Sequence, residues 1–108
     1  MPKQPLEILT ESMFYILMAL RRQERCGVEI AAFVEEKTGG TVSMGPGTLY
    51  TLLGRFQEEG LIQEGGYQNR RRTYRLTETG LARYHRELER LRRCVADGES
   101  EERGRRDG

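Results

Sequence analysis

The 108-residue chain contains no tryptophan, one histidine, two cysteines and no long apolar run. Cys26 and Cys94 have no metal-ligand spacing and suggest no disulfide framework, so reduced thiols in a cytoplasmic protein are the simplest interpretation. His85 lies in no recognisable nucleophile motif, and acidic neighbours such as Glu58-Glu59 do not face each other on a helix. No apolar run approaches the roughly 20 residues that span a bilayer, and no signal peptide is evident. We therefore expect no enzyme, no metal or other cofactor, and no membrane segment.

The composition is that of one small globular domain. A chain of 108 residues is long enough for one domain and too short for two. Hydrophobic residues make up 36% and charged residues 32%, so the core is small for the length and extra burial at a subunit interface is favoured. The net charge is only +1. Any signal for nucleic-acid binding must therefore be local, and Arg70–Arg72 forms such a cluster.

The central feature is a predicted helix within Met44–Ile62. Pro46 suits the first helical position, Gly45 falls at the N-cap, and Gly60 is a stop signal. One face carries apolar residues at helical spacing, namely Leu49, Leu52, Leu53 and Phe56. The opposite face carries Thr48, Thr51, Gly54, Arg55 and Glu58. Such a helix can enter a DNA major groove while its apolar side packs on a core. Taken alone, the stretch also fits an ordinary amphipathic surface helix.

Gly54 is unusual because it lies in the interior of this helix. A glycine there destabilises a helix by about 1 kcal/mol relative to alanine. It is either tolerated drift or a sign that the helix approaches a DNA backbone or base edge closely. Both interpretations stay open at this point.

A basic β-hairpin is predicted directly after the central helix. Leu61 and Ile62 open one strand, Gly65–Asn69 forms a glycine-containing turn, and Thr73–Leu76 is the second strand after the three arginines. A helix followed by a basic hairpin is typical of a winged helix-turn-helix. Tyr74 and Leu76 should point to the core, whereas Thr73 and Arg75 should point outward. The β-prone Thr41–Ser43 segment is expected to add a third strand.

The first predicted helix is apolar on more than one face. Thr10 is its N-cap, and its apolar spacing continues to Arg21. Phe14, Tyr15 and Met18 widen the apolar surface beyond a single stripe, which is typical of a helix with two neighbours. We expect one side to pack in its own domain and the other to meet a second subunit. A second helix is expected over Val28–Lys37.

The last predicted helix begins after its cap, Thr77, and has a narrow apolar seam. The seam has heptad-like spacing and consists of Leu81, Tyr84, Leu88, Leu91 and Val95. The other positions are mostly charged, which favours packing on a partner helix, with intramolecular packing as the alternative. From Asp97 the sequence has no apolar residue, and we expect residues 97–108 to be disordered.

Two stretches resemble the PadR-type transcriptional regulators. The first is Pro46-Gly47-Thr48-Leu49-Tyr50 followed by Leu53, Arg55 and Gly60-Leu61-Ile62. The second, Arg72 to Gly80, is similar to that family's wing and wing exit. The resemblance implies a mainly α-helical fold with a small antiparallel sheet. It divides the chain into a winged helix-turn-helix domain (1–76), a C-terminal dimerisation helix (77–96) and a tail (97–108).

The same resemblance implies a sequence-specific transcriptional regulator, expected to be a homodimeric repressor. A dimer of this kind would bind double-stranded DNA at an inverted-repeat operator. Some PadR-like proteins bind aromatic compounds at the dimer interface. In this chain Phe14, Tyr15 and Tyr84 are the only nearby candidates to stack on such an effector. The alternative function is a winged-helix module for protein–protein contact, which the basic hairpin argues against.

The expected roles divide along the chain. Thr48, Thr51 and Arg55 are candidates for base edges, and the amides around Gly47 favour an anion at the helix start. The resemblance implies that the Tyr50 hydroxyl contacts a phosphate. The wing arginines Arg70, Arg71 and Arg72 should hold the DNA backbone or enter the minor groove. The expected dimer interface comprises Phe14, Tyr15, Met18, Leu81, Tyr84, Leu88, Leu91 and Val95.

Overall fold

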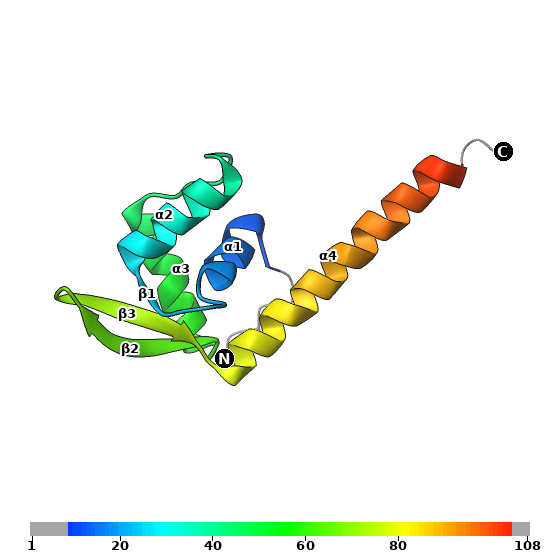
Figure 1. The fold of residues 1–108 in the computed structure, drawn as a ribbon. Coiled ribbons are helices and arrows are strands. Elements are labelled where there is room, and N and C mark those ends of the chain that lie inside the picture. The colour runs from blue at the N-terminus through cyan, green and yellow to red at the C-terminus, as the bar shows by residue number, and fades with distance from the viewer. Residues whose placement is uncertain (1–8, 105–108) are drawn as a thin grey trace.

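The computed structural model describes residues 9–104, which form four helices and three strands (Figure 1). The first eight residues of the predicted 1–76 domain and the last four of the predicted tail lie outside the described residues. The elements are α1 (Glu11–Ala19), β1 (Arg25–Cys26), α2 (Gly27–Thr38), α3 (Pro46–Glu58), β2 (Ile62–Gln68), β3 (Arg71–Leu76) and α4 (Glu78–Gly104). The predicted fold class is confirmed.

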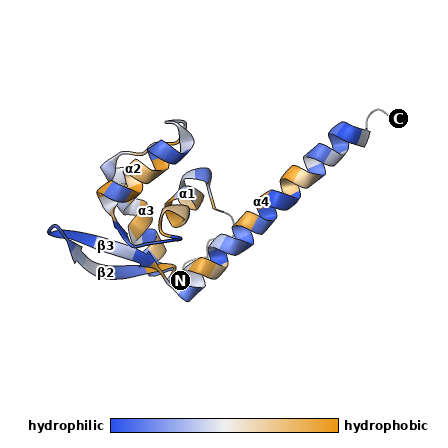
Figure 2. Cartoon of the chain, in the orientation of Figure 1, coloured by the Kyte–Doolittle hydropathy of each residue, from blue (hydrophilic) through white to orange (hydrophobic). Residues whose placement is uncertain are grey.

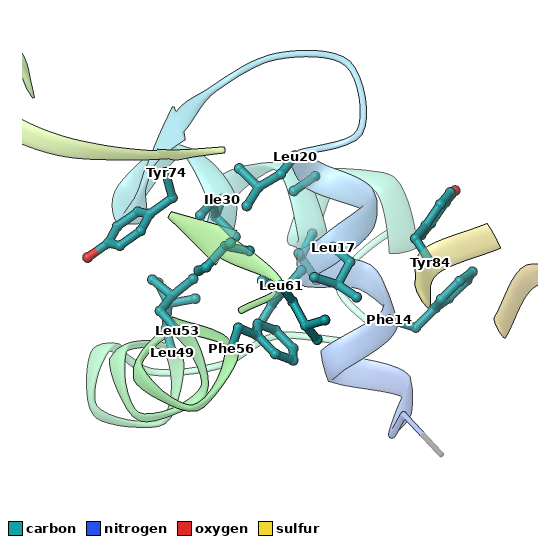
Figure 3. Close-up of a cluster of buried hydrophobic side chains, with 14 of the residues drawn as sticks. Phe14, Leu17, Leu20, Ile30, Leu49, Leu53, Phe56, Leu61, Tyr74 and Tyr84 are labelled. Carbon is teal, nitrogen blue, oxygen red and sulfur yellow. The ribbon is translucent and has the colours of Figure 1, made fainter. Parts of the chain in front are cut away.

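The helices α1, α2 and α3 enclose the core, and the hairpin and α4 extend from it (Figure 1). The largest fully buried apolar side chains come from all three helices and are Ile16, Leu17, Ile30, Val34, Leu53 and Phe56. Figure 3 shows Leu17, Ile30, Leu53 and Phe56 among the core residues. In α2 and α3 these residues recur at three- or four-residue steps, so each of these helices turns one apolar face inward, whereas α1 also buries adjacent residues. Burial of these side chains supplies the main stabilisation of the body, at ~1.5–3 kcal/mol for each large aliphatic or aromatic group.

The two ends of α3 form as the sequence predicts. Gly45 is the N-cap and Pro46 occupies the first turn. After the helix, Gly60 adopts a φ of 76°, a conformation that favours glycine. The amide of Leu61 donates to the Phe56 carbonyl at 2.9 Å and that of Gly60 to the Gln57 carbonyl at 3.0 Å. This pair of hydrogen bonds is a Schellman motif, which turns the chain sharply from α3 into the wing.

The sheet has the strand order β1-β3-β2, with both pairs antiparallel. The third strand is therefore Arg25–Cys26, and the prediction of a strand at Thr41–Ser43 is wrong. The Thr38 hydroxyl accepts a hydrogen bond from the Val42 amide at 3.0 Å. This side-chain contact satisfies the backbone locally, so the segment forms a loop after α2 instead of a ladder.

The orientation of β3 agrees with the prediction except at one residue. Tyr74 is buried, Leu76 is half-buried and Arg75 is exposed, as expected. Thr73 was expected to point to solvent but is only 3% exposed. The reason is that the Glu24 side chain lies over this face of the hairpin and accepts the Thr73 hydroxyl proton, at 2.9 Å.

The start of α4 is fixed against the turn between α3 and β2. The Thr77 hydroxyl accepts from the Gly80 amide at 3.0 Å, which confirms the predicted cap. A Cβ at position 80 would lie 1.9 Å from the Leu61 carbonyl oxygen, so only glycine fits there. Because this contact and the cap act together, the direction in which α4 leaves the body is set at its first turn.

The helix α4 continues to Gly104, so the prediction of disorder from Asp97 is wrong for residues 97–104. The segment has no proline, and its three glutamates and Arg103 favour a helix. The lack of apolar residues removes a packing surface without preventing helix formation. Every residue from Arg92 to Gly104 is exposed, and this end of α4 is mostly hydrophilic (Figure 2).

Candidate nucleic-acid interface

The outer face of α3 is open and carries small residues. Gly47, Thr48 and Thr51 are exposed, and a Cβ placed at Gly54 would meet no atom within 4 Å. No side chain among the described residues caps the first amides of α3. These N–H groups lie at the positive end of the helix dipole and can bind an anion. The geometry therefore leaves both the helix start and its outer face accessible.

Tyr50 lies where α3 meets the start of α2. It is 49% exposed, and a Cβ at Gly27 would lie 2.2 Å from its hydroxyl oxygen. The pKa of Tyr74 on the wing is raised, mainly by burial and to a smaller extent by the charge of the nearby Tyr50. The Tyr50 hydroxyl is thus close to α2, α3 and β3 while part of its ring stays open to solvent. Glycine at position 27 is what permits this packing.

Arg55 does not extend freely from α3. Its Nε lies 3.4 Å from Oε2 of Glu59, and its side chain is 34% exposed. A charged partner one turn away fixes the guanidinium near the end of α3. Sequence reasoning assigned Arg55 without this partner, although the four-residue spacing was a signal for the pair. Contact with a base would require Arg55 to exchange or share Glu59.

The three wing arginines do not form a single patch. Arg70 lies in the two-residue turn, and Arg71 and Arg72 follow in β3, where neighbouring side chains alternate between faces. Arg72 lies 3.0 Å from Glu64 Oε2 and donates to the Tyr67 hydroxyl at 3.3 Å. The Tyr67 hydrogen bond and then the Glu64 charge raise the pKa of Arg72. Arg70 and Arg71 are exposed.

A polar chain of contacts connects α3 to the wing. The Gln57 amide nitrogen lies 3.4 Å from Glu64 Oε2, which also binds Arg72. Tyr67, paired with Arg72 across the strands, is 71% exposed. Sequence reasoning missed Gln57, Glu64 and Tyr67 because their contacts depend on the hairpin register. The strand β2 is longer than expected, and the register follows only from that full length.

The residues of the expected dimer interface fall into three groups, which are buried, half-buried or exposed in one chain. Phe14 and Tyr84 stack within one chain, with ring centroids 5.2 Å apart, and each is 8% exposed. These rings join α1 to α4 and complete the core, so little of their surface is left for a second subunit. Val95 is 58% exposed. The half-buried members are Tyr15, Met18, Leu81, Leu88 and Leu91.

A buried charge cluster lies beside the stacked rings on α4. Glu87 is 2% exposed, and its carboxylate binds Arg90 and also Arg83, the latter at 3.3 Å. Burial would raise the pKa of Glu87, but hydrogen bonds and charges from Arg90 and Arg83 outweigh it and lower that pKa. Sequence analysis counted these residues only among the charged positions outside the seam. The structure buries Glu87 where α4 contacts α1.

Residues 9–104 contain no candidate metal site and no helix that could span a membrane. This part of the chain has no group of three or more histidine, cysteine, aspartate or glutamate side chains placed to hold a metal. None of its helices is long and apolar enough to cross a membrane. Cys26 is buried at the start of α2, Cys94 is exposed on α4, and both are free thiols.

Comparison with known proteins identifies relatives over most of the chain. Residues 16–86 match the transcriptional regulator PadR-like family. A comparison with curated proteins gave no match. A transcriptional regulator from Clostridium thermocellum, Cth-833, is 25% identical, with a TM-score of 0.69 over 84% of this chain and 97% of that one.

Two further solved structures are similar. The complex structure of hsRosR-S1, a form of RosR from H. salinarum, is 31% identical, with a TM-score of 0.68 over 88% of this chain and 84% of that one. Bacillus subtilis PadR in complex with operator DNA is 28% identical, with a TM-score of 0.61 over 70% of this chain and 45% of that one. With a family match over residues 16–86 and a winged helix-turn-helix fold, the chain belongs to the PadR-like family of transcriptional regulators.

Proposed function

We propose that this regulator is a homodimeric repressor that binds an inverted-repeat DNA operator. The observation that carries the proposal is the open outer face of α3 beside an exposed basic hairpin. A small-residue helix face suits entry into the major groove, and a basic hairpin suits the phosphate backbone. The similar B. subtilis PadR has been solved with its operator DNA, which supports the same role here.

The proposed contacts divide between sequence reading and backbone binding. Thr48 and Thr51 contact base edges, with Arg55 joining them where Glu59 releases it. The Tyr50 hydroxyl and the amides around Gly47 contact phosphates. On the wing, Arg70 and Arg71 supply the exposed charge, and Arg72 acts together with Tyr67. In a dimer, the two α3 helices would lie in successive major grooves, about 34–36 Å apart.

The proposed dimer uses the surfaces of α1 and α4 that one chain leaves open. Leu81, Leu88 and Leu91 are half-buried and Val95 is exposed, so a second copy would complete their burial. A cavity of about 290 Å³ at the α1–α4 junction is lined by four apolar or aromatic residues (Leu9, Phe14, Tyr15 and Leu91) and by Thr10, Glu11, Glu87 and Arg90. A small aromatic effector is proposed to bind at this interface, with Tyr15 as its open aromatic contact.

The test is a titration of the purified protein against two duplexes at several salt concentrations. One duplex is an inverted repeat selected from a random pool, and the other is its scrambled counterpart. We expect tight binding to the first only. Replacing Thr48 with Ala should change the preferred base at one position, by about 1–3 kcal/mol. Equal, weak binding to both duplexes would favour the protein–protein interaction module instead.

The wing contribution is separated by a pair of charge-matched variants. Arg71→Ala should weaken binding to both duplexes and reduce the salt slope by about one unit, because one phosphate contact is lost. Arg93→Ala removes the same charge from an exposed position on α4 and should leave the slope unchanged. A similar effect of both variants would mean that net charge, and not the wing, determines binding.

A further inference from the structure

Glu24 connects the segment before β1 to the root of the wing. Its Oε1 accepts a hydrogen bond from the Thr73 hydroxyl at 2.9 Å, and its Oε2 lies 3.5 Å from Nη1 of Arg75. Thr73 is 3% exposed, so loss of this partner would leave a buried hydroxyl unsatisfied. The contact joins residues 49 positions apart, and it fastens the loop after α1 to the middle of β3.

The same carboxylate occupies space that only glycine leaves open. A Cβ at Gly65 would lie 2.3 Å from Glu24 Oε1 and 2.7 Å from its carboxyl carbon. Gly65 is also the point where the register of β2 shifts, because Glu64 pairs with Tyr74 and Gly66 with Thr73. The bulge bends β2, and Glu24 lies directly on that bend. The bulge at Gly65 therefore provides the space that the Glu24 carboxylate occupies.

This position is the one from which the wing tip projects. The last pair between β1 and β3 is Cys26 with Thr73, and beyond it the hairpin has only two strands. On the other face of the hairpin, Glu64 contacts Gln57 of α3 at 3.4 Å. The root of the wing is therefore held by α3 on one side and by Glu24 on the other. Everything that the wing offers to DNA, including Arg70 and Arg71, lies beyond this support.

We propose that Glu24 is a positioning residue that fixes the angle between the wing and α3. This inference rests on the proposed DNA-binding function. With Glu24 in place, the wing arginines and the outer face of α3 are held in one arrangement before DNA arrives. Without it, the hairpin samples several angles and must be ordered on binding, which weakens the complex.

The sign of the effect distinguishes this role from simple electrostatics. Removing a carboxylate from a DNA-binding protein reduces its repulsion of phosphates and should strengthen binding. A positioning role predicts the opposite for Glu24→Ala, a loss of about two- to tenfold, as expected for one lost hydrogen bond. Glu35→Ala is the matched control, because Glu35 is an exposed carboxylate on α2. It should bind as the wild type or slightly more tightly.

Two further variants test the geometry. Glu24→Gln keeps an oxygen that can accept the Thr73 hydroxyl proton, so it should recover most of the affinity. Gly65→Ala would push the carboxylate away and should resemble Glu24→Ala. The thermal midpoint is measured for each variant, so that a loss of affinity caused by partial unfolding is recognised. Binding by Glu24→Ala as tight as that of Glu35→Ala would overturn the proposal.

A measurement without DNA separates this inference from the proposed function. Amide hydrogen exchange should be faster over residues 66–72 in Glu24→Ala than in wild type or Glu35→Ala, while exchange in α2 stays the same. If the wild type binds no duplex, the DNA-binding proposal fails, and exchange still reports whether Glu24 holds the wing. Unchanged exchange over residues 66–72 in Glu24→Ala would show that Glu24 does not position the hairpin.

Discussion

The wing and the end of α4 both extend beyond the core (Figure 1), but the charged residues of the wing tip are basic and those of residues 97–104 are mostly acidic. The tip of the wing contains Arg70, Arg71 and Arg72. The end of α4 contains four exposed acidic residues, Asp97, Glu99, Glu101 and Glu102, and one exposed basic residue, Arg103. A polyanion attracts the first extension and repels the second. The proposed contact with DNA therefore suits the wing and not the end of α4.

The roots of the two extensions are also built differently. The wing is held at its root by exposed or half-exposed polar contacts, from Glu24 on one face and Gln57 on the other. The root of α4 is held by the stacked rings of Phe14 and Tyr84 and by a carboxylate that is almost fully buried. Breaking a polar contact near water costs little, whereas removing one partner of a buried charge pair leaves the other charge uncompensated and costs much more. We therefore expect changes at the root of α4 to affect folding, and changes on the wing to affect binding.

The largest effect is expected at Glu87, in the root of α4. Glu87→Ala would leave the buried Arg83 without this carboxylate, and removing one partner of a buried pair destabilises a protein by about 3–5 kcal/mol. Chemical denaturation followed by circular dichroism measures the free energy of unfolding. Glu89→Ala is the control, because Glu89 forms an exposed pair with Arg92, and it should change that free energy by less than about 0.5 kcal/mol. Similar values for both variants would contradict the difference between the roots.

The pH dependence of stability gives a second measure of Glu87. Burial opposes its charged form, but Arg90 and Arg83 lower its pKa below the ordinary value. A carboxylate with a lowered folded-state pKa stabilises the protein above its unfolded pKa, and this stabilisation is lost as the pH falls through the folded pKa. The loss should therefore occur below about pH 4. In Glu87→Gln, acid should reduce stability less steeply, and an equally steep reduction would contradict the assignment.

The next effect concerns the far half of α4. Val95 is 58% exposed in one chain, so Val95→Asp should leave the fold of the single chain intact. In the proposed dimer, Val95 becomes buried, and an unpaired charge there should weaken self-association at least about tenfold, since burying one valine contributes ~1.5–3 kcal/mol. Ala96→Asp places the same charge one position away from the seam and is the control. Sedimentation that gives equal association for both variants, or a monomeric wild type at micromolar concentration, would count against this interface.

Much of the body could be predicted because its signals are local. Apolar spacing in α3, the proline at its start and the glycine after its end all lie within one stretch of sequence, and each has the expected role. The cap of α4 at Thr77 is local as well. In each case the residue and its partner are within about four positions of each other, so a pattern is sufficient.

The parts that could not be predicted depend on partners far away in the sequence. Thr73 is buried because Glu24 covers it, and Tyr84 is buried in the core because Phe14 stacks on it. Neither partner follows from periodicity. The candidate site was affected in the same way. The residues of the site could be named from the sequence. The contacts of Arg72 with Glu64 and Tyr67 could not, because they depend on the register of the hairpin.

At the tip of the wing we expect a substitution to change stability only slightly and to change DNA binding more. Asn69 and Arg70 have φ values of 52° and 67°, and a two-residue turn of this kind prefers glycine at the second position. Arg70→Gly should therefore stabilise the fold by about 0.5–1 kcal/mol while weakening DNA binding and lowering the salt slope by about one unit. Arg70→Lys keeps both charge and backbone strain and should bind like the wild type. If Arg70→Gly binds DNA unchanged, the strained arginine has no role in binding.

The smallest effect is expected at Gly54, on the outer face of α3. A Cβ at this position meets nothing within 4 Å, so packing within the chain does not require glycine. Gly54→Ala should stabilise the helix by up to about 1 kcal/mol. Gly98→Ala is the matched control, since Gly98 is also inside a helix with open space around it. Both variants should raise the thermal midpoint. Only Gly54→Ala should also weaken operator binding, by a few-fold, because its methyl group would separate α3 from the DNA. Equal operator affinity in the two variants would show that α3 does not need glycine at position 54 to approach DNA. Gly54 would then be a residue that the fold merely tolerates.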